Sequence, residues 1–397
     1  MPTSVTDQRA CHSADREHRN LAVKSIRLVS VDVMRGVTIA FMILVNDPGD
    51  GQHAYSQLKH AFWNGWTATD LVFPTFLFLV GVSIVLAFDS RLARGASKKS
   101  LFAHSLRRAA ILFLLGLVVN GFPYFHLGTL RIYGVLQRIA ICYLLASAIY
   151  LWDRRVGSKV AIIAIALLGY WVLLRWVPVP GFGMPGRDFP LFDPHANLAA
   201  YIDRHIFPGR LYNGFRDPEG LLSTVPSLAT TLLGAMTGMW LQSKRSSISQ
   251  KARWMMVAGI VGIGLGLIWN LWFPINKNLW TSSYVLFAAG CSTVGLAICY
   301  WAVEIKHWKR GWTYFWVVLG TNAITVYVLS ELLSTALWLI KVHAGASKIS
   351  LHRYLFLHGF APVHDLSFAS LLFSIFFVLV CFAPMAILYR KKIFIKI

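Results

Sequence analysis

The chain has 397 residues, of which 56% are hydrophobic and 14% charged, with a mean hydropathy of +0.56. Soluble domains carry about 25% charged residues, so this composition excludes an ordinary soluble domain and indicates a protein built for the lipid bilayer. The net charge of +21 raises the question of a nucleic-acid partner, but the placement of the basic residues along the chain argues against one.

The first 27 residues are polar and charged and contain no apolar stretch, which predicts a cytoplasmic tail without a cleavable signal peptide. Beyond them, apolar runs long enough to cross the bilayer as helices recur along the whole chain. We predict an all-α, polytopic membrane helical bundle of about ten transmembrane helices (ten or eleven), with residues 28–397 forming one domain. The expected spans are 28–46, 70–88, 108–122, 132–151, 160–177, 223–242, 254–273, 283–303, 314–340 and 367–389. The stretch 314–340 is long enough for one tilted span, or for one span with a re-entrant piece.

Lys and Arg residues are unequally divided between the two sides of these spans. With the N-terminus in the cytoplasm, the inside segments hold 25 of the 38, the outside segments hold 11, and Arg35 and Arg138 lie within spans. Cytoplasmic segments of membrane proteins are enriched in Lys and Arg. The bias therefore predicts two cytoplasmic termini and explains most of the basicity with no nucleic acid.

Two outside segments, 47–69 and 178–222, are longer than a hairpin connection requires. Loops longer than about 12–15 residues without obvious structure are usually functional. Between the spans, the glycines of GAMTG (234–238) and GIGLG (262–266) are four residues apart and predict close helix packing. Four of the five cysteines lie within spans and no pair has metal-ligand spacing, so we predict neither a disulfide framework nor a metal site.

Charged residues within the spans are costly and therefore tend to be functional. Asp32 and Arg35 are three residues apart, hence on one helix face, where an interfacial ion pair is the simplest interpretation. Arg138 lies near the middle of the fourth span and Glu331 well inside the ninth. A purely structural interpretation of Arg138 pairs it with Glu331 or Asp32.

The segment LKHAFWNGWTATDLVFP, residues 58–74, concentrates polar and aromatic residues between two very apolar stretches. His60 is a suitable general base, because the pKa of histidine lies near the operating pH. Asp70 could orient its ring, and Asn46, at the outer end of the first span, could donate a hydrogen bond to a developing oxyanion. Close by, Asn64 and the tryptophans Trp63 and Trp66 could contact a sugar. This pattern indicates acyl transfer without a serine or cysteine nucleophile.

Each of these residues also has a simpler interpretation. A single histidine in a loop is usually not functional, and Asp70 is a good N-cap for the second span. The two tryptophans fit the aromatic belt found at membrane interfaces. From the residues alone, catalysis at His60 is the less favoured hypothesis.

Longer motifs decide between these interpretations. VDVMRGVTIAFMILVN, LKHAFWNGWTATDLVFPTFLFLVGVSI, GVLQRIAICYLLA, DPEGLLST, PINKNLWTSSY and GTNAITVYVLSE follow one another along the chain. In this order they closely resemble the catalytic domain of the heparan-α-glucosaminide N-acetyltransferase family, from about residue 28 onward. Members of that family are multi-spanning enzymes that carry the acetyl group of cytosolic acetyl-CoA to a glucosamine amine across the membrane.

The resemblance assigns roles to individual residues. It matches His60 to the family's essential histidine, Asn46 to its conserved asparagine and Asp70 to the aspartate of its DLVFP motif, so all three are expected to be catalytic. It also implies a homodimer. The family's lysosomal members have a large luminal N-terminal region and an extra first span that this chain lacks, which suggests a bacterial inner-membrane relative with a different acceptor.

The donor and the acceptor need sites of opposite charge. The phosphates of acetyl-CoA suit arginine forks, so we expect them at Arg35, Arg107, Arg108 and Arg138. Positive-inside anchoring is the simpler explanation for the basic run 91–108. For an amino-sugar acceptor, we expect contacts from Trp63, Asn64, Trp66, Asp217 and Glu219, although a solvated loop explains the two carboxylates equally well.

The sequence therefore predicts an acetyl-CoA-dependent transmembrane N- or O-acetyltransferase that acts on an extracytoplasmic amino sugar or other glycan, with His60 as base or acyl carrier. The alternative from another class is a secondary transporter of an amino sugar or oligosaccharide. Ten spans, intramembrane charges and aromatic loops would suit such a carrier. The inverted repeats common in transporters are not apparent in this sequence.

Overall fold

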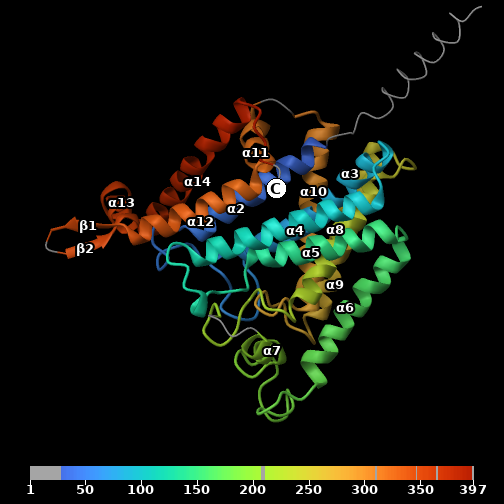
Figure 1. The fold of residues 1–397 in the computed structure, drawn as a ribbon, viewed down its shortest axis with the longest axis horizontal. Coiled ribbons are helices and arrows are strands. Elements are labelled where there is room, and N and C mark those ends of the chain that lie inside the picture. Colours follow the sequence, from blue (N-terminus) through green and yellow to red (C-terminus); the bar gives the residue numbers. More distant parts are fainter. Residues whose placement is uncertain (1–27, 207–210, 309–310, 346, 364, 396–397) are drawn as a thin grey trace, which may run out of the picture.

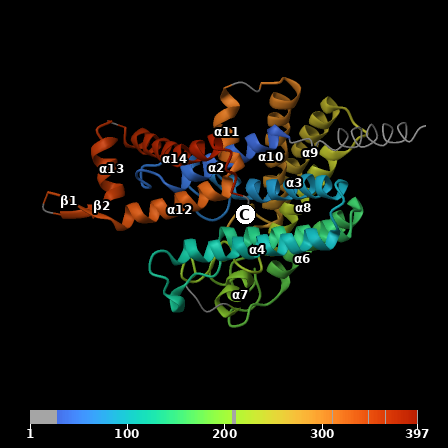
Figure 2. The ribbon, with the colours of Figure 1, turned by 45° about the horizontal axis from the view of Figure 1, so that its top comes forward.

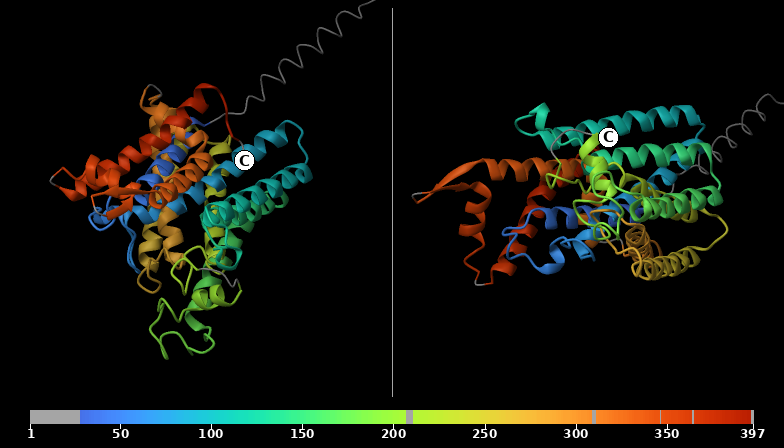
Figure 3. Two further views of the ribbon diagram at one scale, coloured as in Figure 1. Left: turned by 60° about the vertical axis from the view of Figure 1, so that its left-hand side comes forward. Right: turned by 90° about the horizontal axis from the view of Figure 1, so that it is seen from below.

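The computed structural model describes residues 28–206, 211–308, 311–345, 347–363 and 365–395; the predicted tail 1–27 lies outside them. The described part holds 13 α-helices and a single two-stranded hairpin (Figure 1). The predicted all-α, polytopic helical bundle is confirmed. The hairpin of β1 (Lys341–Ala344) and β2 (Ser347–Ser350) was not predicted, and it projects beyond the ends of the helices (Figure 3).

The bundle is built from eleven of the helices, each of which lies within or overlaps a predicted span. They are α2 (Val29–Asn46), α3 (Val72–Ala93), α4 (Lys98–Gly121), α5 (Val135–Trp152), α6 (Val156–Trp176), α8 (Thr224–Gln242), α9 (Ile248–Trp269), α10 (Ser282–Tyr300), α11 (Trp312–Thr321), α12 (Ala323–Leu339) and α14 (Leu366–Arg390). The shorter elements are α7 (Leu198–Ile206), α13 (Leu351–Gly359), three 3₁₀ turns η1 (Ser56–Leu58), η2 (Ala68–Leu71) and η3 (Leu127–Thr129), and a π-helical turn η4 (Trp301–Ile305).

Eight described helices are long and apolar enough to cross a membrane, or nine spans if the bent pair α11–α12 counts as one. The predicted span 223–242 also forms a helix, α8, but it is not among the eight. Its sequence includes five Ser and Thr residues, which lower its hydropathy, and buried ones such as Ser227 and Thr231 bond to carbonyls of their own helix. The expected ten spans therefore number eight or nine by length and hydropathy alone.

The stretch 314–340, for which two arrangements were open, is broken and not straight. Helices α11 and α12 meet at Asn322 with a bend of 80°. Just before the break, the carbonyl oxygen of Gly320 accepts a hydrogen bond from Arg35 of α2 at 3.2 Å. A Cβ at Gly320 would lie 2.0 Å from the carbonyl oxygen of Asp32, so glycine lets the two backbones touch at this point.

Helix α4 begins earlier than predicted, at Lys98 and not near residue 108. Its N-cap is Ser97, whose hydroxyl accepts a hydrogen bond from the Ser100 amide at 3.1 Å. Charged and polar side chains continue a helix as well as apolar ones do, and hydropathy alone misses such a first turn. Arg107 and Arg108 therefore lie on the helix itself and not in a cytoplasmic loop.

Helices α2, α3, α5 and α10 form the centre of the bundle, while α4, α6 and α9 are mostly exposed at its periphery, as expected for surfaces that face lipid. The most extensive packing joins α9 to α10, α3 to α8, α2 to α11 and α4 to α5. A Cβ at Gly266 would lie 2.6 Å from the backbone nitrogen of Phe287, and one at Gly234 would lie 1.9 Å from the carbonyl oxygen of Phe78. The predicted packing role of these glycine motifs is confirmed.

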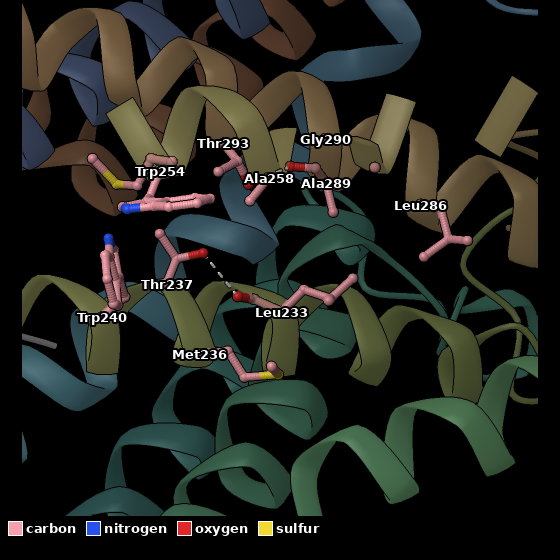
Figure 4. A pocket seen from close by; sticks show the side chains of 12 residues that line it. Leu233, Met236, Thr237, Trp240, Trp254, Ala258, Leu286, Ala289, Gly290 and Thr293 are labelled. Atoms are coloured by element: carbon pink, nitrogen blue, oxygen red, sulfur yellow. Dashed lines mark hydrogen bonds between the residues drawn. The ribbon is translucent and has the colours of Figure 1, made fainter. Parts of the chain in front are cut away.

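An apolar groove of about 460 Å³ lies between α8, α9 and α10 (Figure 4). Its lining is aliphatic or aromatic except for Thr237 and Thr293. Both threonine hydroxyls donate to carbonyl oxygens of their own helices, at 3.1 Å and 2.7 Å. The indoles of Trp240 and Trp254 stand at one end of this groove (Figure 4).

Several connections come together at one end of the bundle. They are the segment between α2 and α3, the segment between η3 and α5, the long segment that contains α7, and the turn between α9 and α10. In Figures 1 and 2, α7 lies beyond the end of α6, outside the helical bundle. The predicted long loop 178–222 thus carries a helix of its own. All four connections fall in segments for which the charge distribution predicts an outside location.

Candidate active site

A cavity of about 600 Å³ opens where these connections meet, and it reaches between α2, α3, α5 and α12. Charged and polar side chains form much of its wall. The lining includes Asn46, His60, Phe62, Asp70, Arg131, Tyr212, Arg216, Glu219, Lys277, Tyr327 and Glu331. The structure thus brings together residues that are up to 285 positions apart in the sequence.

His60 and Asp70 form a hydrogen-bonded pair at the wall of this cavity. The Nδ1 atom of His60 lies 2.7 Å from Oδ1 of Asp70, while the His60 side chain is 51% exposed and that of Asp70 only 1%. An ionised carboxylate only accepts hydrogen bonds, so Nδ1 carries the proton and Nε2 keeps its lone pair. His60 is therefore oriented by a buried carboxylate and keeps a basic nitrogen, Nε2, as a general base requires.

The second oxygen of Asp70 is held by the local backbone. Its Oδ2 atom accepts hydrogen bonds from the amides of Ala61 and Thr67, both at 3.0 Å, and from the Thr67 hydroxyl at 3.1 Å. Thr67 and Asp70 form a capping box at the start of η2. Asp70 is therefore not the predicted N-cap of the second span, because Thr67 holds that position and Asp70 is the third residue of the turn. One of its oxygens completes the capping box, and the other contacts the imidazole of His60.

Lys277, in the turn between α9 and α10, lies against the same imidazole. Its Nζ atom is 3.2 Å from Nε2 and 3.1 Å from Nδ1 of His60, and 3.9 Å from Oδ1 of Asp70. Burial lowers the pKa of Lys277, so the neutral form of its amine is reached at a lower pH than for a lysine in water. We did not select this lysine from the sequence, although it stands inside the recognisable motif PINKNLWTSSY.

Arg131, before α5, binds two carboxylates of the long segment. Its Nε and Nη2 atoms donate to Asp217, both at 2.7 Å, and Nη2 also donates to Glu219 at 2.6 Å. Burial alone would raise the pKa of the Glu219 carboxyl, but the cations Arg131, Arg138 and Lys277 hold it below its usual value. The pair is a bidentate fork that ties the long segment to the wall of the cavity.

Glu331, on α12, is a further carboxylate of the cavity wall. Its Oε1 atom accepts a hydrogen bond from the Asn46 side chain at 3.2 Å, and the Tyr327 hydroxyl is its second hydrogen-bonding neighbour. Within the described part of the chain, no Lys, Arg or His side chain forms an ion pair with it. This separates Glu331 from Asp217 and Glu219, which are paired.

With this geometry established, comparison with known proteins identifies the family. The family described as heparan-alpha-glucosaminide N-acetyltransferase, catalytic, matches residues 27–274, well over half of the chain. The chain belongs to this family.

Two relatives carry the same name as the family. The heparan-alpha-glucosaminide N-acetyltransferase of Mus musculus is 32% identical over 371 residues, which cover 81% of this chain and 56% of the relative. That of Homo sapiens is also 32% identical, over 355 residues that cover 77% of this chain and 53% of the relative. The chain thus spans about half the length of these curated relatives. It is an integral membrane protein of an acetyltransferase family.

The family match includes the three residues expected to be catalytic, and the structure places all three at the cavity. His60 and Asp70 contact each other directly. Asn46 contacts Glu331 and not the imidazole, so one of its amide hydrogens is already used. Their catalytic roles stay predictions.

The aromatic residues chosen as sugar contacts lie mostly behind the cavity wall. The indole nitrogen of Trp63 donates to the carbonyl oxygen of Phe192 at 3.0 Å, and the Trp66 ring packs on Phe287 with centroids 4.7 Å apart. Asn64 accepts a hydrogen bond from Asn276 at 3.1 Å. These three residues join the His60 segment to neighbouring segments, whereas the cavity itself is lined by the fully exposed Phe62.

Arg216 is a further cation of the cavity that sequence reasoning missed. Its guanidinium stacks over the Trp63 ring at 4.4 Å, and its Nε and Nη1 atoms have no hydrogen-bond partner in the described part of the structure. Tyr212 stands beside it in the cavity wall and stacks on Arg131 at 4.8 Å. In the sequence, the length of the loop 178–222, the motif DPEGLLST and the carboxylates Asp217 and Glu219 pointed toward this region, but nothing singled out Arg216.

The four arginines expected to bind the donor do not form one cluster. Arg35 pairs with Asp32 at 3.0 Å, which confirms the predicted ion pair, and also donates to Ser83 at 2.7 Å. The Arg108 guanidinium stacks over Tyr143 at 4.9 Å and its Nε has no partner among the described residues, while Arg107 is exposed.

Arg138 lies in the first turn of α5, next to the cavity, and not near the middle of its span as predicted. It is fully buried, donates to the carbonyl oxygen of Gly220 at 3.0 Å and to the Ser223 hydroxyl, and stacks over Trp280 at 5.0 Å. It therefore pairs with neither Glu331 nor Asp32, the partners that a structural role suggested. Its contacts fasten the segment after Glu219 to the bundle.

Proposed function

We propose that this protein is a transmembrane acetyltransferase that moves the acetyl group of cytosolic acetyl-CoA to an amino sugar or other glycan on the extracytoplasmic side. We further propose, from the family resemblance, that it acts as a homodimer in a bacterial inner membrane with both termini in the cytoplasm. The single observation that carries the proposal is the His60–Asp70–Lys277 constellation in the wall of a polar cavity.

The constellation suits acyl transfer to a nucleophile. The acceptor nitrogen or oxygen attacks the thioester carbonyl carbon, the bond to sulfur breaks, and coenzyme A leaves as a thiolate. Nε2 of His60 accepts the proton that the nucleophile loses and returns it to the thiolate. Lys277, as an ammonium, places positive charge where the carbonyl oxygen and the sulfur become negative.

A two-step route uses the same atoms. Nε2 of His60 attacks the thioester first, so that a C–N bond forms, the C–S bond breaks and the thiolate leaves. The acceptor then attacks acetyl-His60 and releases the imidazole. During the second attack of this route, Nε2 of His60 is still bonded to the acetyl group and cannot accept a proton. Another base must therefore take the proton from the acceptor.

The donor enters from the basic side of the protein in this proposal. Arg107 and Arg108 are the residues best suited to its phosphates, because neither forms an ion pair among the described residues. Arg35 is engaged by Asp32, Ser83 and Gly320. None of these three lines the cavity at His60, so the thioester must reach it through the long pantetheine arm.

The proposal is tested by incubating the purified protein with radiolabelled acetyl-CoA and a panel of amino sugars and neutral sugars. Transfer of label to a sugar is the expected result. Acetyl-CoA should also raise the melting temperature, because a ligand that binds only the folded state stabilises it. A protein that transfers no label, and whose melting temperature responds to free sugar but not to acetyl-CoA, would be a carrier and would refute the proposal.

A further inference from the structure

N-acetylation of an amino sugar has a proton balance that one base does not complete. The acceptor is an ammonium in water, and it must lose one proton before it attacks and a second as the amide forms. The coenzyme A thiolate takes up only one of them, so one proton leaves the site in each turnover. This inference rests on the proposed function, and it asks which group of the cavity receives the additional proton.

The carboxylates of the cavity differ in what already neutralises them. Asp70 is used by His60, by the Ala61 amide, and by the amide and hydroxyl of Thr67, its partner in the capping box. Asp217 and Glu219 are bound by the Arg131 fork at 2.6–2.7 Å. Arg138 and Lys277 add positive charge next to Glu219, and Lys277 Nζ lies 3.9 Å from Oδ1 of Asp70. These three carboxylates already have cations beside them, so each gains less from an ammonium than a carboxylate with neutral partners does.

Glu331 is the exception among the carboxylates of the described cavity wall. Its two polar neighbours, the Asn46 amide and the Tyr327 hydroxyl, are neutral and orient the carboxylate without matching its charge. Its position on a helix, and not on a loop, fixes it relative to His60. A half-buried carboxylate with neutral partners is a favourable site for one cation. The cation neutralises the carboxylate's charge and forms charge-assisted hydrogen bonds with it, which offsets the cost of removing both charges from water.

We propose that Glu331 binds the protonated primary amine of the acceptor and takes its first proton. The ammonium transfers this proton to the carboxylate, which gives a neutral amine and a carboxylic acid. The amine attacks the acetyl carbon, its second proton passes through Nε2 of His60 to the thiolate, and Glu331 then releases its proton to the outside. The acceptor class is therefore a primary amine, and hydroxyl acceptors are not favoured at this subsite.

The groups that face Glu331 determine how its proton exchange depends on pH. They are Asn46 from α2, Tyr327 from its own helix, the acid Asp47 just after α2, and Arg131, whose charge is shared with Asp217 and Glu219. His60 and Lys277 face the same cavity from the opposite connections. Changes at Glu331 should therefore be compared across pH and not at one pH only.

The test compares two acceptors in the full-length membrane protein. Glucosamine is an ammonium near neutral pH, whereas an arylamine such as aniline is already neutral and needs no first deprotonation. Glu331→Gln keeps the acceptor oxygen for Asn46 but removes the base. We expect kcat/KM for glucosamine to fall by roughly 10²-fold while transfer to the arylamine changes only a few-fold.

A pH profile supplies an independent readout. Glucosamine transfer by Glu331→Gln should rise about tenfold per pH unit as the free amine becomes available in solution, a rescue that a packing defect would not give. Glu304→Gln is the matched control, because Glu304 lies outside the cavity and accepts the Ser30 amide at 3.1 Å, which glutamine can also do. The control should behave as wild type with both acceptors.

Unchanged glucosamine transfer in Glu331→Gln would overturn the inference, and so would an equal loss with both acceptors. Wild-type protein that acetylates neither amine would refute the proposed function itself. If Glu331→Gln does not fold, Glu331→Asp decides the matter. It keeps a carboxylate but moves it by one methylene, and it should lower glucosamine transfer more than arylamine transfer; an unchanged ratio would contradict the inference.

Discussion

The polar cavity at His60 and the apolar groove between α8, α9 and α10 are of similar size, about 600 and 460 Å³, yet they differ in every chemical respect. The cavity collects charged side chains from loops and helices far apart in the sequence. The groove is lined by consecutive turns of three neighbouring helices, and its threonines bond to their own backbones.

The difference shows that volume alone does not identify a functional site in a membrane protein. Grooves between lipid-facing helices arise wherever small residues alternate with large ones, and lipid chains can fill them at little cost. A group of charges at the end of a bundle is costly and must be stabilised by mutual contacts. The cavity is therefore where transfer should be sensitive to single substitutions, and the groove is where it should not be.

The largest effect is expected at His60. A base or acyl carrier acts in the transition state, so His60→Ala should lower turnover by about 10²–10⁴-fold while acetyl-CoA still stabilises the protein. Acetyl transfer and thermal melting measure the two properties separately. His53→Ala is the control in the same segment, since His53 is exposed and its Nδ1 atom lies 2.8 Å from Oδ2 of Asp50. Equal loss in both variants would mean that this segment is only a scaffold.

A smaller effect is expected at Lys277. Lys277→Met keeps most of the side-chain volume but removes the amine next to His60, and it should lower turnover by roughly 10²-fold, the magnitude typical of one lost electrostatic stabiliser. KM for the acceptor should change much less than kcat. A full-rate Lys277→Met enzyme would show that the contact with the imidazole has no part in the reaction.

The two regions should also differ in how they couple stability to pH. Asp203 lies on α7, and Asp47 directly follows α2. Burial raises the pKa of each of these two carboxyl groups to about 7. The folded state then holds protons that the unfolded state has released, so stability should fall as pH rises from about 4 to 7 and level off above. Each group accounts for at most about 4 kcal/mol.

Asp203→Asn isolates one of these contributions. Asparagine can still accept the hydrogen bond that the Leu221 amide donates to Asp203 at 3.0 Å, but it does not titrate. Melting temperatures measured between pH 4 and 8 should decline less in the variant, and Asp47 should account for much of the remaining slope. A slope identical to that of wild type would mean that Asp203 stays ionised when folded.

The smallest effect is expected in the groove. Thr237→Val removes a hydroxyl that donates only to Leu233 of the same helix and preserves the shape of the side chain (Figure 4). Acetyl transfer should stay within about twofold of wild type, as for most substitutions away from special features. A tenfold loss in an assay with purified protein in defined lipid would assign the groove a part in the reaction.

The sequence by itself determined the class of protein and most of its helices. Apolar runs separated by basic and polar segments predict a helical membrane bundle, because an unpaired backbone is too costly in lipid. The motifs around His60, Asp70 and Asn46 identified the family. Hydropathy could not show that α4 starts at Lys98, where a capped polar turn extends the helix, or that α11 and α12 bend at Asn322, because it measures composition and not the direction of the backbone.

The composition of the site was decided only by the tertiary structure. Lys277, Arg131 and Glu331 lie on three separate segments, and nothing local in their sequences shows that they share one cavity with His60. Tertiary contacts also decide which carboxylates of this region form an ion pair with an arginine. Arg131 reaches Asp217 and Glu219 but forms no ion pair with Glu331, because long-range packing and not sequence spacing sets the distances over which charges interact.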